Sequence, residues 1–434
     1  MRKIHHAWVV AAVAFVALLG AAAFRAAPGP LMVPLNEDLG WSITTMSAAV
    51  SVNLVLYGLT APFAAALMER LGVRRVTSVA LVLIAAGAGL SALATAAWQL
   101  MLTWGLLIGL GTGSMALVFA ATVTNAWFVR RRGLVMGILT AGGAAGQLVF
   151  LPVVAHLAAT AGWQVASLLV AAVALAVLPL VVLVLRDRPS DLGLAPYGGD
   201  TVLPRPIPSG SAVRTALGAL RDAARTRAFW ALAGGFAICG ATTNGLVGIH
   251  FIPSAHDHGM ATTTAAGLLA VVGVFDIVGT ITSGWLTDRV DPRLLLLAYY
   301  TFRGVGLVLL PWLLSATLHP SIVLFVVVYG LDWVATVPPT VMLCRRVFGA
   351  RGTIVFGWVF ASHQLGAAAA AFAAGVIRDN LGSYTYAWLG GAALCVVAAI
   401  LSISLRSRPE PPSPAAPTAP VSGPAAEAAL DLTP

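Results

Sequence analysis

Twelve stretches of about 20 apolar residues follow one another along this chain, and they constrain its fold more than any other feature. With 59% hydrophobic and 9% charged residues, the chain has too little polar surface to cover a water-soluble particle of this size. Lipid cannot satisfy exposed backbone groups and the alternation of a barrel strand is missing, so each stretch is predicted to be a transmembrane helix. The predicted spans are residues 8–34, 44–68, 76–95, 98–126, 133–159, 163–185, 229–252, 262–285, 294–316, 320–342, 352–376 and 384–405.

A charged motif occurs twice, about half a chain length apart. The segment from Glu69 to Arg74 returns as the segment from Asp288 to Arg293, a shift of 219 residues. A second motif follows at nearly the same shift, since Gly146 matches Gly366, 220 residues later. Two unlinked motifs that agree on one period predict an all-α membrane protein of two pseudo-symmetric six-helix bundles, with a substrate held between them.

The same pattern sets the predicted domain boundaries. The N-terminal bundle is expected to cover residues 1–185 and the C-terminal bundle residues 229–406. The hydrophilic stretch 186–228 contains several prolines in its first half and is predicted to be a cytoplasmic linker. Residues 407–434 are rich in proline and alanine and have few large apolar side chains, so this tail is predicted to be disordered.

Positive charges gather at alternate ends of the predicted spans. If the N-terminus is cytoplasmic, 22 of the 25 lysines and arginines lie on the cytoplasmic side, and only Arg25, Arg303 and Arg378 do not. This bias predicts a multi-pass protein of the cytoplasmic (inner) membrane with both termini inside the cell. The net charge of +9 is therefore expected to orient the chain in the lipid bilayer, and no nucleic-acid partner is expected.

The repeated charged motif resembles the signature loop of the major facilitator superfamily between helices 2 and 3, and its echo between helices 8 and 9. The resemblance covers residues 7–406 and implies that both copies hold a cytoplasmic gate by charge pairing and helix-end contacts. The first copy departs from the pattern, with Ala65 and Glu69 where glycine and aspartate are usual. The implied gating residues are Glu69, Arg70, Arg74, Arg75, Asp288, Arg289 and Arg293.

Within the superfamily, three segments are similar to the monocarboxylate porters and their bacterial relatives, which include oxalate/formate exchangers. They are the opening Ala7–Val10, the run from Trp127 to Gly142 and the loop Arg188–Leu194. The resemblance implies a transporter of small organic anions. That family carries an aspartate on helix 8 and, one turn later, an arginine that binds the substrate carboxylate. Here Asp276 matches the aspartate, but Thr280 stands four residues later.

Three ionisable side chains are predicted to share the middle third of the membrane, where each charge needs a partner or a function. At about 1.5 Å rise per residue, Asp276 and Arg303 lie ~18 and ~15 Å from the cytoplasmic face, and Asp332 reaches a similar depth. One interpretation is a buried ion network among helices 8, 9 and 10. The other is that Arg303 replaces the missing arginine as anion ligand, and that protonation of Asp276 loosens it and couples a proton to the substrate.

Seven polar side chains in the predicted spans are candidates for binding the substrate. Arg25 lies in the outer half of helix 1, near the position where monocarboxylate porters carry a substrate-attracting lysine. The alternative interpretation is that its side chain extends to the outer lipid headgroups. With His250, near the outer end of helix 7, it would form an electropositive vestibule. His363, at mid-depth in helix 11, is either a hydrogen-bonding core residue or a proton carrier. The other candidates are Gln364, Asn53, Tyr57 and Gln147.

Together these patterns predict secondary active transport of a small organic anion, a monocarboxylate, by alternating access with a proton. The sequence contains no nucleotide-binding loop, metal-ligand cluster or nucleophile arrangement, so neither enzymatic activity nor a cofactor is expected. The alternative is an exporter of a neutral or amphipathic metabolite or drug, although the helix 4 arginine and helix 5 Gly-Pro motif of drug/proton exchangers are missing. A third class, a transporter-like sensor, would be expected to carry a long ordered cytoplasmic extension.

Overall fold

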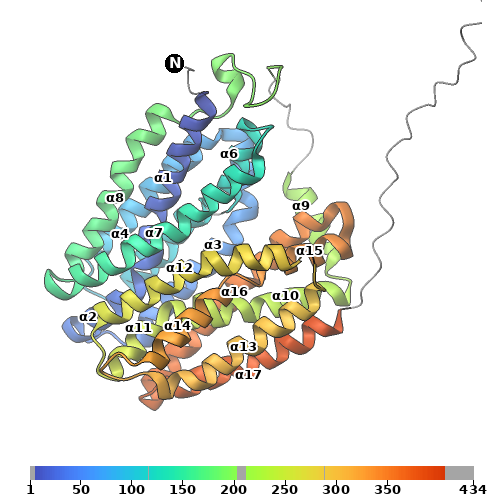
Figure 1. Ribbon diagram of the computed structural model, residues 1–434. Coiled ribbons are helices and arrows are strands. Elements are labelled where there is room, and N and C mark those ends of the chain that lie inside the picture. The colour runs from blue at the N-terminus through green and yellow to red at the C-terminus, as the bar shows by residue number, and fades with distance from the viewer. Residues whose placement is uncertain (1–4, 116, 203–211, 288, 406–434) are drawn as a thin grey trace, which may run out of the picture.

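A computed structural model describes residues 5–115, 117–202, 212–287 and 289–405, and Figure 1 shows them as a bundle of long helices. Within these residues the chain crosses the membrane twelve times, as the apolar stretches predict. Eleven crossings are long and apolar enough by themselves, and the fifth contains a shorter apolar helix from Ala145 to Thr160.

Spans 1 to 6 are α1 with α2 (His6–Ala26, Pro28–Leu39), α3 (Ile43–Leu71), α4 (Val73–Ser91), η1 with α5 and α6 (Met101–Ile108, Gly109–Ser114, Leu117–Trp127), α7 (Arg132–Thr160) and α8 (Trp163–Val184). Spans 7 to 12 are α10 with η3 and α11 (Arg227–Gly240, Ala241–Val247, Gly248–Asp257), α12 (Thr262–Thr287), α13 (Pro292–Leu313), α14 with α15 (Pro320–Asp332, Val337–Phe348), α16 (Gly352–Leu381) and α17 (Thr385–Ser404).

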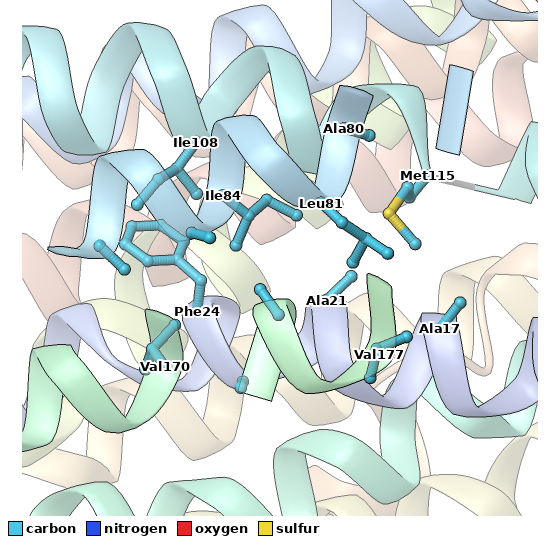
Figure 2. Close-up of a cluster of buried hydrophobic side chains, with 14 of the residues drawn as sticks. Ala17, Ala21, Phe24, Ala80, Leu81, Ile84, Ile108, Met115, Val170 and Val177 are labelled. Atoms are coloured by element: carbon cyan, nitrogen blue, oxygen red, sulfur yellow. The ribbon is translucent and has the colours of Figure 1, made fainter. Parts of the chain in front are cut away.

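Spans 1 to 6 and spans 7 to 12 form two bundles, here called the N-bundle and the C-bundle, and most residues of each buried apolar cluster come from one of them. In the N-bundle, small side chains of α1 let two neighbouring helices approach closely. Figure 2 shows Ala17 and Ala21 of α1 near Leu81 of α4 and Val177 of α8. Because dispersion and close packing hold membrane helices together, these small residues stabilise the bundle by allowing contact.

The repeated glycines Gly146 and Gly366 occupy equivalent positions in the two bundles. A Cβ on Gly146 of α7 would overlap the backbone of Leu19 in α1. A Cβ on Gly366 of α16 would overlap the backbone of Ala237 in α10. Span 5 thus packs on span 1 as span 11 packs on span 7, and the sequence repeat reflects this shared backbone contact.

Gly366→Ala is expected to lower the midpoint of thermal unfolding in detergent. The new methyl group must push two helix backbones apart, and such overpacking costs about 1 to 3 kcal/mol. Gly390→Ala in α17 is the matched control, because a Cβ there meets no atom within 4 Å. Equal midpoints for the two variants would contradict the close approach of α10 and α16.

Spans 1, 4, 7 and 10 are each interrupted, so the first span of every group of three is not a continuous α-helix. Pro28 breaks the first, since proline has no N–H and crowds the carbonyl one turn earlier. The fourth and seventh contain the π-helical segments η1 and η3, and residues 333–336 separate α14 from α15. Interruptions of this kind in membrane helices free backbone groups and often border a binding site.

The linker is attached to both bundles on one side of the molecule, here called the linker side; the opposite side is the distal side. Asp187 accepts a hydrogen bond from the backbone N–H of Arg74 (2.8 Å), and the backbone of Tyr197 pairs with that of Val129. Two short helices belong to the linker, η2 (Pro189–Leu192) and α9 (Ala212–Ala223), and the turn η4 (Gly349–Arg351) precedes α16. Asp222 of α9 pairs with Arg351. Residues 406–434, which contain the predicted disordered tail, lie outside the described part of the chain.

Candidate substrate site

A cavity of about 50 Å³ lies between the two bundles and touches three of the four helix interruptions. The break in span 1 contributes Phe24, Arg25 and Pro28, and the π-helical segment of span 7 contributes Asn244. Trp333, in the break of span 10, forms a further part of the wall. Five of the seven predicted substrate-binding residues line this one cavity: Arg25, Asn53, Tyr57, Gln147 and Gln364.

Arg25 supplies the positive charge of the cavity. Its side chain is exposed, and the guanidinium carbon lies 5.5 Å from the ring centroid of Tyr57, a cation–π contact that holds it in place. Gly143 of α7 faces the guanidinium: a Cβ built there would lie 4.0 Å from Nη1. Among the residues described, no carboxylate forms an ion pair with Arg25, so its charge is available to an anion.

Amide side chains provide most of the other polar groups. Gln364 is 2% exposed, and its Oε1 has no hydrogen-bond partner among the described residues, so a ligand donor would satisfy it. Asn53 already uses part of its hydrogen-bonding capacity, because its Nδ2 donates to the carbonyl of Trp104 at 2.7 Å. Asn244 and Trp333 are not among the residues predicted from the sequence, although an asparagine inside an apolar span is a detectable signal.

The two candidate histidines lie outside the cavity lining. His250 is fully buried, with Nε2 2.8 Å from the carbonyl oxygen of Ala371 and Nδ1 3.3 Å from the hydroxyl of Tyr384, so both ring nitrogens are used within the C-bundle. His363 packs between Phe236 and Phe360, and its Nδ1 has no partner among the described residues. The vestibule of Arg25 and His250 is not formed here, because the ring of His250 bonds to its own bundle.

The intramembrane charges form a compact network around the break in span 10. The buried Arg303 donates from Nε to Asp332 Oδ2 (2.6 Å) and from Nη2 to the backbone carbonyl of the same residue (2.7 Å). Asp276 takes no part in that ion pair. Its Oδ1 accepts from the hydroxyl of Thr280 (3.0 Å) and from the backbone N–H of Val334 (3.1 Å). The threonine that stands in place of the family's arginine thus bonds to Asp276.

This network holds residues 333–336 from two sides. Arg303 of α13 bonds to carbonyls at the end of α14, and Asp276 of α12 bonds to the N–H of Val334. None of these charges lines the cavity, but Trp333, between the two attachment points, does. The network therefore contacts the cavity through the side chain of Trp333. The roles of Asp276, Arg303 and Asp332 in substrate or proton binding stay predictions.

On the distal side the two bundles contact each other directly. The backbone N–H of Thr44 at the start of α3 donates to Asp379 Oδ2 at the end of α16 (2.7 Å). Further along α3, the hydroxyl of Ser51 donates to the carbonyl of Ala368 (2.7 Å). Figure 1 shows α7 and α12 close together at their distal ends and apart toward the linker side. The bundles are thus joined at the distal end.

Asp379→Ala is expected to weaken this distal contact and to favour a distal-open conformation. A cysteine placed at Ser47, which is buried against Gly375 at the same interface, should then react several-fold faster with a membrane-impermeant maleimide, because each 1.4 kcal/mol of lost contact shifts a population about tenfold. Asp257→Asn is the control, since Asp257 pairs with Arg378 within the C-bundle. Unchanged labelling in Asp379→Ala would show that this hydrogen bond does not hold the bundles together.

The predicted gating residues lie on the linker side with partners that the sequence did not indicate. Arg293 pairs with Asp291 (2.6 Å), and this hydrogen bond lowers the pKa of the Asp291 carboxyl. Arg289 stacks on Trp285, with 4.2 Å from its guanidinium carbon to the ring centroid. The side chains of Arg70 and Arg75 are exposed, and that of Arg74 is half-buried. Asp288 and the side chain of Glu69 lie outside the described part of the structure, so the gate stays a prediction.

Known proteins share both the sequence pattern and the fold. The family model described as Major Facilitator Superfamily matches residues 14–356. The chain belongs to the major facilitator superfamily. Relatives include an uncharacterized MFS-type transporter, YcxA, of Bacillus subtilis, 25% identical over 93% of this chain and 95% of that protein. Monocarboxylate transporter 11 of Mus musculus is 33% identical over 69% of this chain and 64% of that protein.

This member of the superfamily is a membrane transporter of two six-helix bundles, as the repeat predicts. The human monocarboxylate transporter 11 is 29% identical and covers 92% of this chain and 82% of its own length. A bacterial homologue of the human lysosomal transporter Spinster, solved in an inward-facing and unoccupied conformation, has the same fold, with a TM-score of 0.65 and 15% identity. It covers 93% of this chain and 96% of that structure.

Proposed function

We propose that this transporter moves a small organic anion, a monocarboxylate, across the cytoplasmic membrane by alternating access together with a proton. The observation that carries the proposal is Arg25, a cation with no carboxylate partner among the described residues, in a cavity between the bundles. A guanidinium matches the geometry of a carboxylate and can donate two hydrogen bonds to it. The relatives named monocarboxylate transporters support the same substrate class.

The size of the cavity favours a small ligand. Its volume of about 50 Å³ suits a few water molecules or a short acid, whereas drug-sized ligands occupy pockets of roughly 300 to 1,000 Å³. Apart from Arg25, the polar wall consists of neutral amides and a phenol, which would bond to the carboxylate or to its substituents. This argues against the exporter of a bulky amphipathic compound.

The proton is assigned to Asp276. In this structure its carboxylate accepts the N–H of Val334, next to Trp333 of the cavity wall. Adding a proton weakens that acceptor, and the break in span 10 then loses one of its two attachments. Protonation of Asp276 and binding of the substrate would thus both change the contacts of the break in span 10. Because both events act on this one segment, each can change the affinity for the other, as coupled transport requires.

The orientation proposed is with both ends of the chain in the cytoplasm. The two ends of the described chain lie on the linker side: His5 packs against Tyr197, and the carbonyl of Leu405 accepts a hydrogen bond from Arg293. That side also carries most of the arginines, as expected for the cytoplasmic face.

Uptake into proteoliposomes tests the proposal. Labelled short monocarboxylates should accumulate when the outside is acidic relative to the lumen, and less when a protonophore collapses the gradient. The measurement is the initial rate of uptake against protein-free vesicles. Absence of movement for every acid, with and without a gradient, would refute the anion assignment, whereas gradient-independent uptake would refute only the proton.

A further inference from the structure

A second cavity, of about 260 Å³, opens between α13 and α14 and is separate from the substrate site. Its wall is almost entirely apolar, and the side chains at its rim are among the most exposed of the C-bundle. Phe302, Val305 and Leu309 of α13 are exposed by 48 to 62%, and Leu324 of α14 by 63%. In a chain that spans the membrane, such side chains face lipid tails. The cavity is therefore a groove that opens to the bilayer.

The inner end of this groove is polar. Arg303 and Asp332 belong to its lining, although Asp332 is only 5% exposed. Its Oδ2 accepts the hydrogen bond from Arg303, but its Oδ1 is buried and has no partner among the described residues. A buried polar atom left without a hydrogen bond costs roughly 1 to 3 kcal/mol, so a donor that reached it from the groove would be stabilised.

The position of Asp332 limits what that donor can be. It lies twelve residues into α14 from the distal end, about 18 Å along the helix, close to the centre of a hydrocarbon layer of ~30 Å. A phosphate headgroup cannot be placed at that depth without a high desolvation cost. A cationic head would face Arg303 and an anionic head would face Asp332, so a neutral hydroxyl is the donor that fits.

We propose that the groove between α13 and α14 binds a neutral amphiphile of the fatty-alcohol class, which enters from the bilayer and donates its hydroxyl to Oδ1 of Asp332. The chain of the ligand would run toward the distal surface, past Leu324 to Ser321. Asp332 lies eleven residues after Ser321, so the groove is about 16 Å long, which accommodates a medium-length alkyl chain. This ligand is distinct from the transported anion and does not depend on its identity.

Photolabelling of the full chain in proteoliposomes tests this site. A diazirine derivative of octanol should form adducts concentrated on peptides of α13 and α14. n-Decanol at about ten times its Kd should reduce that labelling about tenfold, whereas the same concentration of n-decane, which has no donor, should not. Labelling spread over all lipid-facing helices, or equal competition by decanol and decane, would overturn the proposal.

A matched pair of glycine substitutions tests whether the ligand binds in the groove. Gly306→Leu should fill the cavity, because Gly306 lines it and a Cβ there comes 3.4 Å from Phe325. Gly390→Leu adds the same side chain where a Cβ meets nothing within 4 Å. Loss of labelling on α13 and α14 in Gly306→Leu alone is expected, and equal labelling of the two variants would contradict the site. The alcohol and alkane competition uses the unaltered chain, so the proposal remains testable if Gly306→Leu does not fold.

Discussion

Arg25→Gln is expected to reduce monocarboxylate uptake about 10- to 140-fold at low substrate concentration. A hydrogen bond to a charged group contributes roughly 1.5 to 3 kcal/mol, and each 1.4 kcal/mol is a factor of ten in affinity. The guanidinium is the only ionised side chain of the described cavity wall, so no neighbour can replace it. The measurement is the initial rate of uptake into proteoliposomes, normalised to the amount of reconstituted protein.

Two further variants define what Arg25 contributes. Arg25→Lys keeps the charge but loses the two-pronged donor geometry, so uptake should fall between that of the native chain and that of Arg25→Gln. Arg225→Gln removes an exposed arginine outside the cavity lining and should leave uptake unchanged. Native rates in Arg25→Gln would show that the anion binds elsewhere and would remove the main support for the proposed function.

Asp332→Leu is expected to cause a larger loss of stability than Gly366→Ala. It leaves the fully buried Arg303 without its carboxylate, and an uncompensated buried charge of this kind costs about 3 to 5 kcal/mol. Arg303→Met strands the carboxylate and should cost a similar amount. Both effects would be measured as the midpoint of thermal unfolding in detergent, with Leu331→Ala on the same helix as a control for packing.

The double variant Arg303→Met with Asp332→Leu separates a structural role from a transport role. Replacing both charges by apolar side chains removes the cost of burying them, so most of the lost stability should return. If the stable double variant still transports, the pair is a structural link to the break in span 10. A stable double variant without transport would instead support the hypothesis that Arg303 takes part in coupling. Additive losses in the double variant would contradict the ion pair.

The candidate site could be predicted in part from single residues. A polar side chain in an apolar stretch is costly, and this cost alone marks Arg25, Tyr57 and Gln364 as candidates. The same criterion selects His250, whose ring nitrogens bond within the C-bundle, and it applies equally to Asn244, which lines the cavity but was not among the predicted residues. The two residues differ in the direction in which their side chains leave the helix. The π-helical segment η3, which contains Asn244, locally changes how the residues of span 7 are rotated about the helix axis.

By itself the sequence determined the twelve membrane spans and the two-bundle repeat, because the length and composition of each apolar stretch decide locally whether it crosses a bilayer. It also determined that Gly146 and Gly366 recur at one period. Only the tertiary structure decided that Arg303 bonds to the end of α14 and Asp276 to Val334, and that Trp333 reaches the cavity. Those contacts join helices far apart in the chain, and their geometry follows from how the packed helices are rotated and where span 10 breaks, which no local pattern specifies.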